Sequence, residues 1–178
     1  VVDPESLVSD WQGSLTWRDK TYNLEREGDE FWVDMVEQDW KATDATKRFL
    51  IASEGSNERV RKRVLMSTGS HHQQVYWVSS GKGREMELFP FTWLIDEKRW
   101  IPYEESFLRP KLEHEESTIW NVRCIKCHAT HGQPQLDAAG IPDTRVAELG
   151  IACEACHGPG EEHVLSLIHI SEPTRPRL

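Results

Sequence analysis

Apolar and polar residues alternate in short runs over residues 11–102, which is the pattern of β-strands that bury one face. In DEFWVDMVE, residues 29–37, Phe31, Val33 and Met35 fall on one side and the residues between them on the other. Further period-two runs, rich in β-branched and aromatic residues, are QQVYWVSS, REMELF and FTWLI. We therefore predict an antiparallel β layer in this half of the chain.

Turn-forming residues separate these runs. FTWLIDEKRWIPY, residues 91–103, predicts a hairpin in which two apolar runs flank the charged turn Asp96–Arg99. Glycine-bearing turns are predicted in REGDE, residues 26–30, and in SSGKGRE, residues 79–85. The strands should therefore be joined by hairpin turns.

The pattern changes near residue 110. KLEHEESTIWNVRCIKCH and DTRVAELGIACEACH favour short helices, separated by the Gly- and Pro-containing loop HGQPQLDAAGIPD. Asp143 is a candidate N-cap of the second helix, because its carboxylate can accept the unpaired amides of the first turn. The expected fold class is α+β, with a β-rich domain at 1–108 and a small, mostly helical and loop-rich domain at 109–164.

The two ends of the sequence are unusual. The chain begins VVDPES without a methionine, so the start looks internal and the missing signal peptide carries little information about compartment. Residues 165–178 contain LSLIHISEPTR, which resembles the translation of a transposon-type sequencing adapter. We interpret 165–178 as a non-native tail, with the natural reading frame cut near Val164, and discount His169 as a ligand.

Composition and charge narrow the class of protein. A hydrophobic content of 38% with eight tryptophans is enough to form a core. The formal net charge of −9 argues against a nucleic-acid or anionic-membrane partner. No apolar run approaches the roughly 18 residues that span a bilayer. The basic run NERVRKR, residues 57–63, is interpreted as a solvated strand edge.

The four cysteines all lie in two similar segments, CIKCH and CEACH. Two thiols three positions apart lie near each other on a helical turn, with a histidine directly after them. This arrangement suits covalent capture of a haem, in which the thiols add to the two vinyl groups and the histidine ligates the iron. The predicted sets are Cys124, Cys127 and His128, and Cys153, Cys156 and His157.

Two other interpretations use the same cysteines. A C-x2-C pair followed after 25 residues by another could form a four-thiolate zinc site, and four cysteines could form disulfides. Neither explains why a histidine follows each pair directly. The sequence therefore favours haem, with a structural zinc module as the minor alternative.

These motifs resemble the multihaem c-type cytochromes of the tetrahaem electron-transfer and hydroxylamine-oxidoreductase kind, particularly because the second continues as GPGEEH. TGSHHQQVYW, LFPFTWLIDEKRWIP and WNVRCIKCHATHGQP are similar to bacterial multihaem proteins of that group. The resemblance covers residues 60–164 well and the first 60 loosely. Members of the family usually carry further Cys-x-x-Cys-His sets, so the resemblance implies a fragment and leaves the total haem number open.

The sixth ligand of each iron separates an electron carrier from an enzyme. The resemblance implies that His163 is a distal ligand of a neighbouring haem. His71 and His72 are adjacent, so in a strand only one of them could reach an iron. His131 is a candidate ligand or propionate partner, whereas His114, among glutamates, is interpreted as solvated. The methionines at 35, 66 and 86 stay open as alternatives.

The expected function is one-electron transfer by a multihaem cytochrome c with two haem c groups in this fragment. The resemblance implies a bacterial, periplasmic or otherwise extracytoplasmic location. The expected partners are redox proteins and further haem domains of a full-length protein. The alternative is a haem oxidoreductase acting on a small nitrogen or sulfur compound, which needs an open iron position beside polar catalytic groups.

Overall fold

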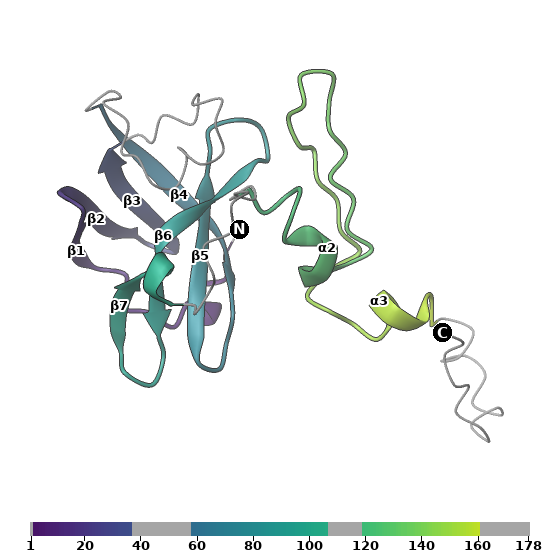
Figure 1. The fold of residues 1–178 in the computed structure, drawn as a ribbon, viewed down its shortest axis with the longest axis horizontal. Helices are drawn as coiled ribbons and strands as arrows, with labels where there is room; N and C mark the ends of the chain where they lie inside the picture. The colour runs from purple at the N-terminus through teal and green to yellow at the C-terminus, as the bar shows by residue number, and fades with distance from the viewer. Residues whose placement is uncertain (1, 37–57, 107–118, 161–178) are drawn as a thin grey trace.

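The computed structural model describes residues 2–36, 58–106 and 119–160, which form a β-rich part and a smaller segment beside it. The β-rich part is one antiparallel sheet in which each strand pairs with the next, in the order β1 to β7 (Figure 1). Its elements are η1 Pro4–Ser6, β1 Gly13–Trp17, β2 Lys20–Glu27, β3 Glu30–Val36, β4 Arg59–Thr68, β5 Gln73–Ser79, β6 Met86–Leu94, β7 Arg99–Pro102 and η2 Tyr103–Glu105. The sheet is nearly closed on itself.

The strand predictions for this half are confirmed. In β3, Phe31, Val33 and Met35 are buried, while the residues between them are partly exposed. The predicted hairpin is formed by β6 and β7, which pair from Phe91 with Pro102 to Leu94 with Arg99. The runs REMELF and FTWLI, which looked separate in the sequence, form the single strand β6.

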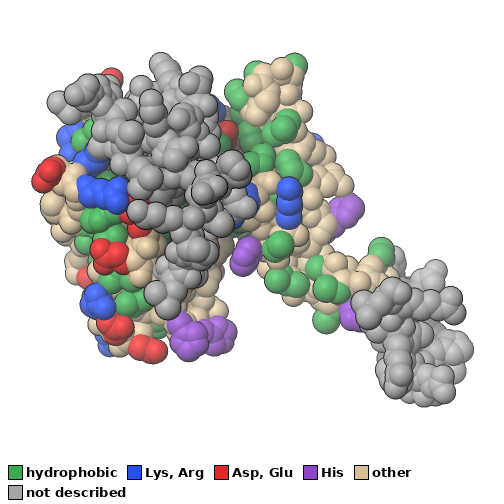
Figure 2. All heavy atoms as spheres, in the orientation of Figure 1, with side chains coloured by type: hydrophobic (Ala, Val, Ile, Leu, Met, Phe, Trp, Pro, Cys, Tyr) green, Lys and Arg blue, Asp and Glu red, His purple; other side chains and the backbone are tan. Residues whose placement is uncertain are grey.

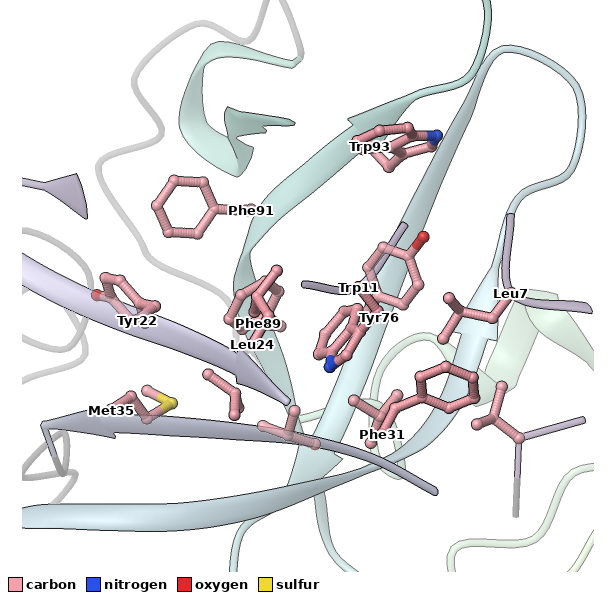
Figure 3. Packing of buried hydrophobic residues seen from close by; sticks show 14 residues of the cluster. Leu7, Trp11, Tyr22, Leu24, Phe31, Met35, Tyr76, Phe89, Phe91 and Trp93 are labelled. Carbon is pink, nitrogen blue, oxygen red and sulfur yellow. The ribbon is translucent and has the colours of Figure 1, made fainter. Parts of the chain in front are cut away.

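The core of the sheet is aromatic (Figure 3). Trp11 is completely buried, and its ring centroid lies 4.9 Å from that of Tyr76, 5.4 Å from that of Phe89 and 5.5 Å from that of Trp100. The Trp11 indole Nε1 donates a hydrogen bond to the Trp32 carbonyl at 2.9 Å. The core is therefore filled by interlocking aromatic rings, and the indole N–H of Trp11 has a hydrogen-bond partner inside it.

The described part of the basic run has a strand neighbour on one side only, because residues 59–63 pair with β3 whereas the pairing of β4 with β5 begins at Val64. Its arginines pair with carboxylates of β2 and β3, at N–O distances of 2.5–2.9 Å. These ion pairs are Arg59–Asp34, Arg61–Glu25, Arg61–Glu27 and Arg63–Glu30. Lys62 is buried instead and pairs with the buried Glu87. The run is thus neutralised within the sheet.

The prediction of an α+β fold with a mostly helical second part is wrong. Described residues 119–160 contain two helices of four residues each, α2 Ile125–His128 and α3 Glu154–His157, so the described chain is mostly β. Between them lies a two-stranded pair, β8 Ala129–Thr130 with β9 Glu148–Leu149. The described segment is therefore built around a long excursion of the chain, residues 129–149, whose two halves are extended and pair with each other.

Pairing over a distance overrides the local helix preference of residues 143–149. The Asp143 amide donates to the Gln135 carbonyl at 2.9 Å, and Gln133 and Arg145 exchange two such bonds. Asp143 is therefore a member of a hairpin ladder, and the prediction that it caps a helix is wrong. The second helix begins only after Gly150, whose φ of +97° ends the extended run.

Candidate haem-attachment site

The first cysteine motif occupies a single helical turn. Cys124 has helical backbone angles, and its carbonyl accepts hydrogen bonds from the amides of Cys127 at 3.1 Å and His128 at 2.8 Å. Residues three positions apart on a helix share a face, so the two thiols lie on one side of the turn. The turn ends at Ala129, where the backbone becomes extended and β8 begins.

The β-sheet holds this turn through a second apolar cluster on its outer face. The cluster contains buried side chains from β5 and β6 together with residues of α2, β8 and the turn before α2: Val75, Trp77, Leu88, Trp120, Ile125 and Ala129. Met66, Met86, Tyr103, Cys124 and Val146 pack against it. The first motif is therefore docked on the sheet, with its Cys124 at the edge of the apolar contact.

Asn121 connects the sheet, the first motif and the long excursion of the chain. Its side chain is completely buried. The Oδ1 atom accepts from the Met86 amide at 2.8 Å, and Nδ2 donates to the Arg84 carbonyl at 3.0 Å and to Thr144 Oγ1 at 2.8 Å. Asn121 lies three residues before Cys124, so these bonds fix where the first motif begins.

The excursion between the motifs also touches the sheet at the turn between β5 and β6. A Cβ on Gly83 would lie 3.1 Å from a methyl of Ile141, which shows how closely the two loops approach. The Arg84 Nε lies 3.3 Å from the Asp143 carboxylate. The β5–β6 turn therefore forms a second contact between the two parts of the chain.

The second motif repeats the geometry of the first in a more exposed place. Cys153 has helical backbone angles, and its carbonyl accepts from the His157 amide at 3.0 Å. After His157 the chain turns at Gly158, with φ of +76°, and the Gly160 amide donates to the Glu154 carboxylate at 2.7 Å. In Figure 1, α3 lies farther from the sheet than α2 does.

The surface around the motifs fits a large apolar group. Cys127, Cys153 and Cys156 are exposed. Three of the four exposed large hydrophobic side chains among the described residues belong to this segment, namely Leu136 (56%), Leu149 (58%) and Ile151 (66%). Figure 2 shows green apolar side chains over the segment 119–160, while most of the visible charged side chains lie over the β-rich part. Exposed apolar side chains four and two residues before Cys153 fit a covalently attached porphyrin that would cover them.

The alternative interpretations of the cysteines find no support in this geometry. All four cysteines lie within the described residues, and none of them forms a disulfide there. The described part of the chain also holds no group of three or more His, Cys, Asp or Glu side chains arranged for a metal ion. The four thiols are therefore not gathered into a tetrahedral zinc site.

The candidate distal histidines are placed in different parts of the structure. His71 and His72 are exposed on the β4–β5 turn, at the opposite end of β5 from the turn that contacts Asn121. His131 is exposed, has a left-handed backbone with φ of +49°, and its Nε2 lies 2.8 Å from the Gln133 side-chain nitrogen. His163, His114 and the tail at 165–178 lie outside the described residues.

Sequence reasoning missed several residues that shape this site. No sequence motif and no periodic pattern includes these residues, which are Asn121, Thr130, Leu149 and Ile151. The one available signal was Asn121 itself, which is a single polar residue between the apolar residues Trp120 and Val122. A polar residue in such a place is typically buried and hydrogen-bonded. Their roles depend on contacts with residues far along the chain.

Comparison with known proteins supports the haem interpretation for the part that contains the motifs. A family model described as cytochrome c554 and c-prime matches residues 98–158, a range that includes both Cys-x-x-Cys-His sets and covers about a third of the chain. No curated protein and no solved structure matches the chain. No helix in the described residues is long and apolar enough to cross a membrane. Residues 98–158 are thus similar to a c-type cytochrome, which implies covalently bound haem c and haem-based electron transfer.

Proposed function

We propose that this chain is part of a multihaem c-type cytochrome that transfers single electrons through two covalently attached haems. The observation that carries the proposal is the repeated geometry of the two motifs, each a single helical turn with two thiols on one face and a histidine next to the second. The cytochrome family match over residues 98–158 supports the same class.

Each residue of a motif has a defined role. Cys124 and Cys127, by adding their S–H bonds across the two vinyl groups, would form the thioethers that fix one porphyrin. His128 would offer a neutral imidazole nitrogen to the iron, and the second set would do the same for the other haem. The bound group supplies the chemistry of electron transfer, a one-electron change between ferric and ferrous iron.

The distal ligands are part of the same proposal. We assign His163 as distal ligand to a haem other than the one held by Cys153, Cys156 and His157. The reason is that the Gly158–Gly160 turn directs the chain away from His157. His71, His72 and His131 are the further candidates. A fully histidine-ligated pair of irons would favour an electron carrier over an enzyme, because no coordination position is left for a substrate.

The proposal gives successive parts of the chain different roles. Residues 1–108 serve as a β-rich scaffold and residues 109–164 as the haem-binding part, which the scaffold holds through its outer apolar cluster. Residues 165–178 are excluded from the function as a foreign tail. The partners are redox proteins and further haem domains, in a bacterial periplasm or another extracytoplasmic place where c-type haem is attached.

The test is expression of the chain with a c-type haem maturation system. The intact mass should rise by two haems, the colour should resist acid–acetone extraction, and each double variant, Cys124→Ala with Cys127→Ala or Cys153→Ala with Cys156→Ala, should lose one haem. An unchanged mass with stoichiometric zinc would refute the proposal. A high-spin spectrum with an open iron would favour the oxidoreductase alternative.

His163→Ala tests the distal assignment in the same preparation. One haem should become high-spin and bind carbon monoxide, while both thioether-linked haems stay attached by mass. If both haems remain low-spin and closed, His163 does not ligate an iron within this chain.

A further inference from the structure

The two cysteine motifs are 29 residues apart in sequence, yet the chain returns to the first motif just before it begins the second. Strand β8 starts directly after His128, and β9 ends four residues before Cys153. Ala129 pairs with Leu149 and Thr130 with Glu148, and the Gly150 amide donates to the His128 carbonyl at 3.1 Å. The histidine of one motif is therefore bonded to the residues that lead into the other.

This return path limits how far apart the motifs can lie. Gly150 and Cys153 are three positions apart in the sequence, so their Cα atoms can be at most about 11 Å from each other. Backbone groups joined by a hydrogen bond between strands have Cα atoms about 5.5 Å apart. Cys153 therefore lies within about 16 Å of His128, and the haems attached to the two motifs would be neighbours.

The side chain that fixes this return is Thr130. It is 3% exposed. Its hydroxyl donates to the Gly150 carbonyl at 3.0 Å and accepts from the Ala152 amide at 3.0 Å, so the oxygen acts as donor and acceptor at once. Its own carbonyl accepts from the Ala147 amide at 3.1 Å. One buried residue thus holds both sides of Gly150.

Little else in the described structure fixes the second motif. The β8–β9 ladder has only two residue pairs, and the main packing contact of α3 is with β8. Gly150, with φ of +97°, is a point at which the backbone can change direction easily. Ile151 and the three residues Cys153, Cys156 and His157 are exposed. The Thr130 hydroxyl is therefore the side-chain bond that most directly restrains the orientation of the second motif.

We propose that Thr130 is a positioning residue that holds the second haem-attachment motif in a fixed place beside the first, so that the two haems form a closely coupled pair. This proposal rests on the proposed attachment of two haems. It adds the residue that sets their mutual geometry, through hydrogen bonds and not through contact with either iron.

The experiment compares Thr130→Val, which keeps the side-chain shape and removes the hydroxyl, with Thr130→Ser, which keeps the hydroxyl, in the haem-loaded full chain. Thr92→Val is the matched control, because Thr92 is also buried but its hydroxyl has no partner among the described residues. Intact mass counts the haems in every variant. The Soret circular dichroism band, which splits when two porphyrins are close and fixed relative to each other, reports their geometry.

In Thr130→Val the mass should still show two haems, while the Soret splitting is largely lost and the Ala152 amide exchanges with solvent about tenfold faster. Thr130→Ser should retain most of both signals, and Thr92→Val should leave both unchanged. Amide exchange in the wild-type protein gives an independent measurement that does not depend on how the variants fold. There, the Ala152 amide should be clearly more protected than that of Glu154, for which no acceptor is found among residues 2–36, 58–106 and 119–160.

Three results would overturn the inference while leaving the proposed function intact. They are two haems with unchanged splitting in Thr130→Val, equal loss in Thr130→Ser, or an unprotected Ala152 amide in the wild-type protein. A wild-type chain that carries no haem would instead refute the proposed function, and the coupled pair with it.

Discussion

Replacing Asn121 by alanine should separate the haem-binding segment from the sheet. The change removes the acceptor of the Met86 amide and the donor to both the Arg84 carbonyl and Thr144 Oγ1. Met86 is half-buried at the start of β6, which has a strand on each side, so we expect water to replace the partner of its amide less easily than in an exposed turn. Arg84 lies on the exposed β5–β6 turn, where water can replace the lost bond more easily.

The magnitude follows from these differences in solvent access. A buried amide left without a partner costs about 2 kcal/mol, and a bond that water can partly replace costs about 0.5 kcal/mol. The sum for Asn121→Ala is about 3 kcal/mol of the free energy of unfolding. In a chain of this size that corresponds to a decrease in Tm of about 6–12 °C.

The assay is urea unfolding of the haem-loaded chain, followed by two signals. Far-UV circular dichroism reports mainly the sheet, and the Soret signal reports the haem-binding segment. In Asn121→Ala the Soret transition should move to lower urea and precede the far-UV transition, because the bonds between the two parts are lost first. Thr144→Val removes one of the three bonds of the Asn121 amide and also the bond from the Thr144 hydroxyl to the Pro134 carbonyl at 3.1 Å, and should cost only about 1 kcal/mol.

Asn121→Asp supplies a check through pH. It keeps the acceptor of the Met86 amide but places a carboxylate against two oxygens in a buried site, which raises the pKa of that carboxyl in the folded state. A group with a raised folded pKa favours the folded state more at low pH, so the deficit relative to wild type should shrink as the pH falls from 7 to 4. Coincident and unshifted transitions in Asn121→Ala, or a deficit smaller than that of Thr144→Val, would refute the reasoning.

Three further changes test other parts of the structure. Leu149→Ser with Ile151→Ser should leave the apoprotein as stable as before, because both side chains are exposed, yet lower the Tm of the haem-loaded chain; an equal effect on both forms would show that no haem covers them. Gly132→Ala should destabilise the first motif by about 1–3 kcal/mol in urea unfolding, because a Cβ there would lie 2.5 Å from the buried isoleucine of α2; a neutral result would contradict that close packing. The hydrogen bond from Arg59 holds the pKa of the Asp34 carboxyl below its ordinary value of 3.8, so this pair stabilises the fold above that pH and the contribution is lost as the pH falls through the lowered pKa. Asp34→Asn should therefore flatten the acid limb of a plot of stability against pH, and an unchanged limb would show that the pair contributes nothing.

The sequence predicted the first half of the fold well because its information is local. The side-chain period of β3, the charged turn before β7 and the glycine turns are each set by a few neighbouring residues. It misjudged β6 as two runs because Pro90 lies between them. In the structure Pro90 falls where the pairing with β5 shifts register, so the strand continues through it.

The second half was harder to predict because its backbone pairs with distant partners. Residues 143–149 have the composition of a helix, but pairing with residues 129–135 makes them extended. No local pattern contains that partner, so helix propensity gave the wrong answer. Asn121 was missed for the same reason, since its partners lie between 23 and 37 residues away along the chain.

The sequence by itself predicted the chemistry proposed for this protein, because the two thiols and the histidine of each motif are neighbours on one helical turn and need no distant residue to meet. Only the tertiary structure decided how the two motifs are arranged. It docks the first on the outer face of the sheet through Asn121 and returns the chain to it through Thr130. Both residues make hydrogen bonds to partners far along the chain, and these bonds close long loops. Closing such a loop costs conformational entropy, which is offset by contacts that exist only in the folded chain.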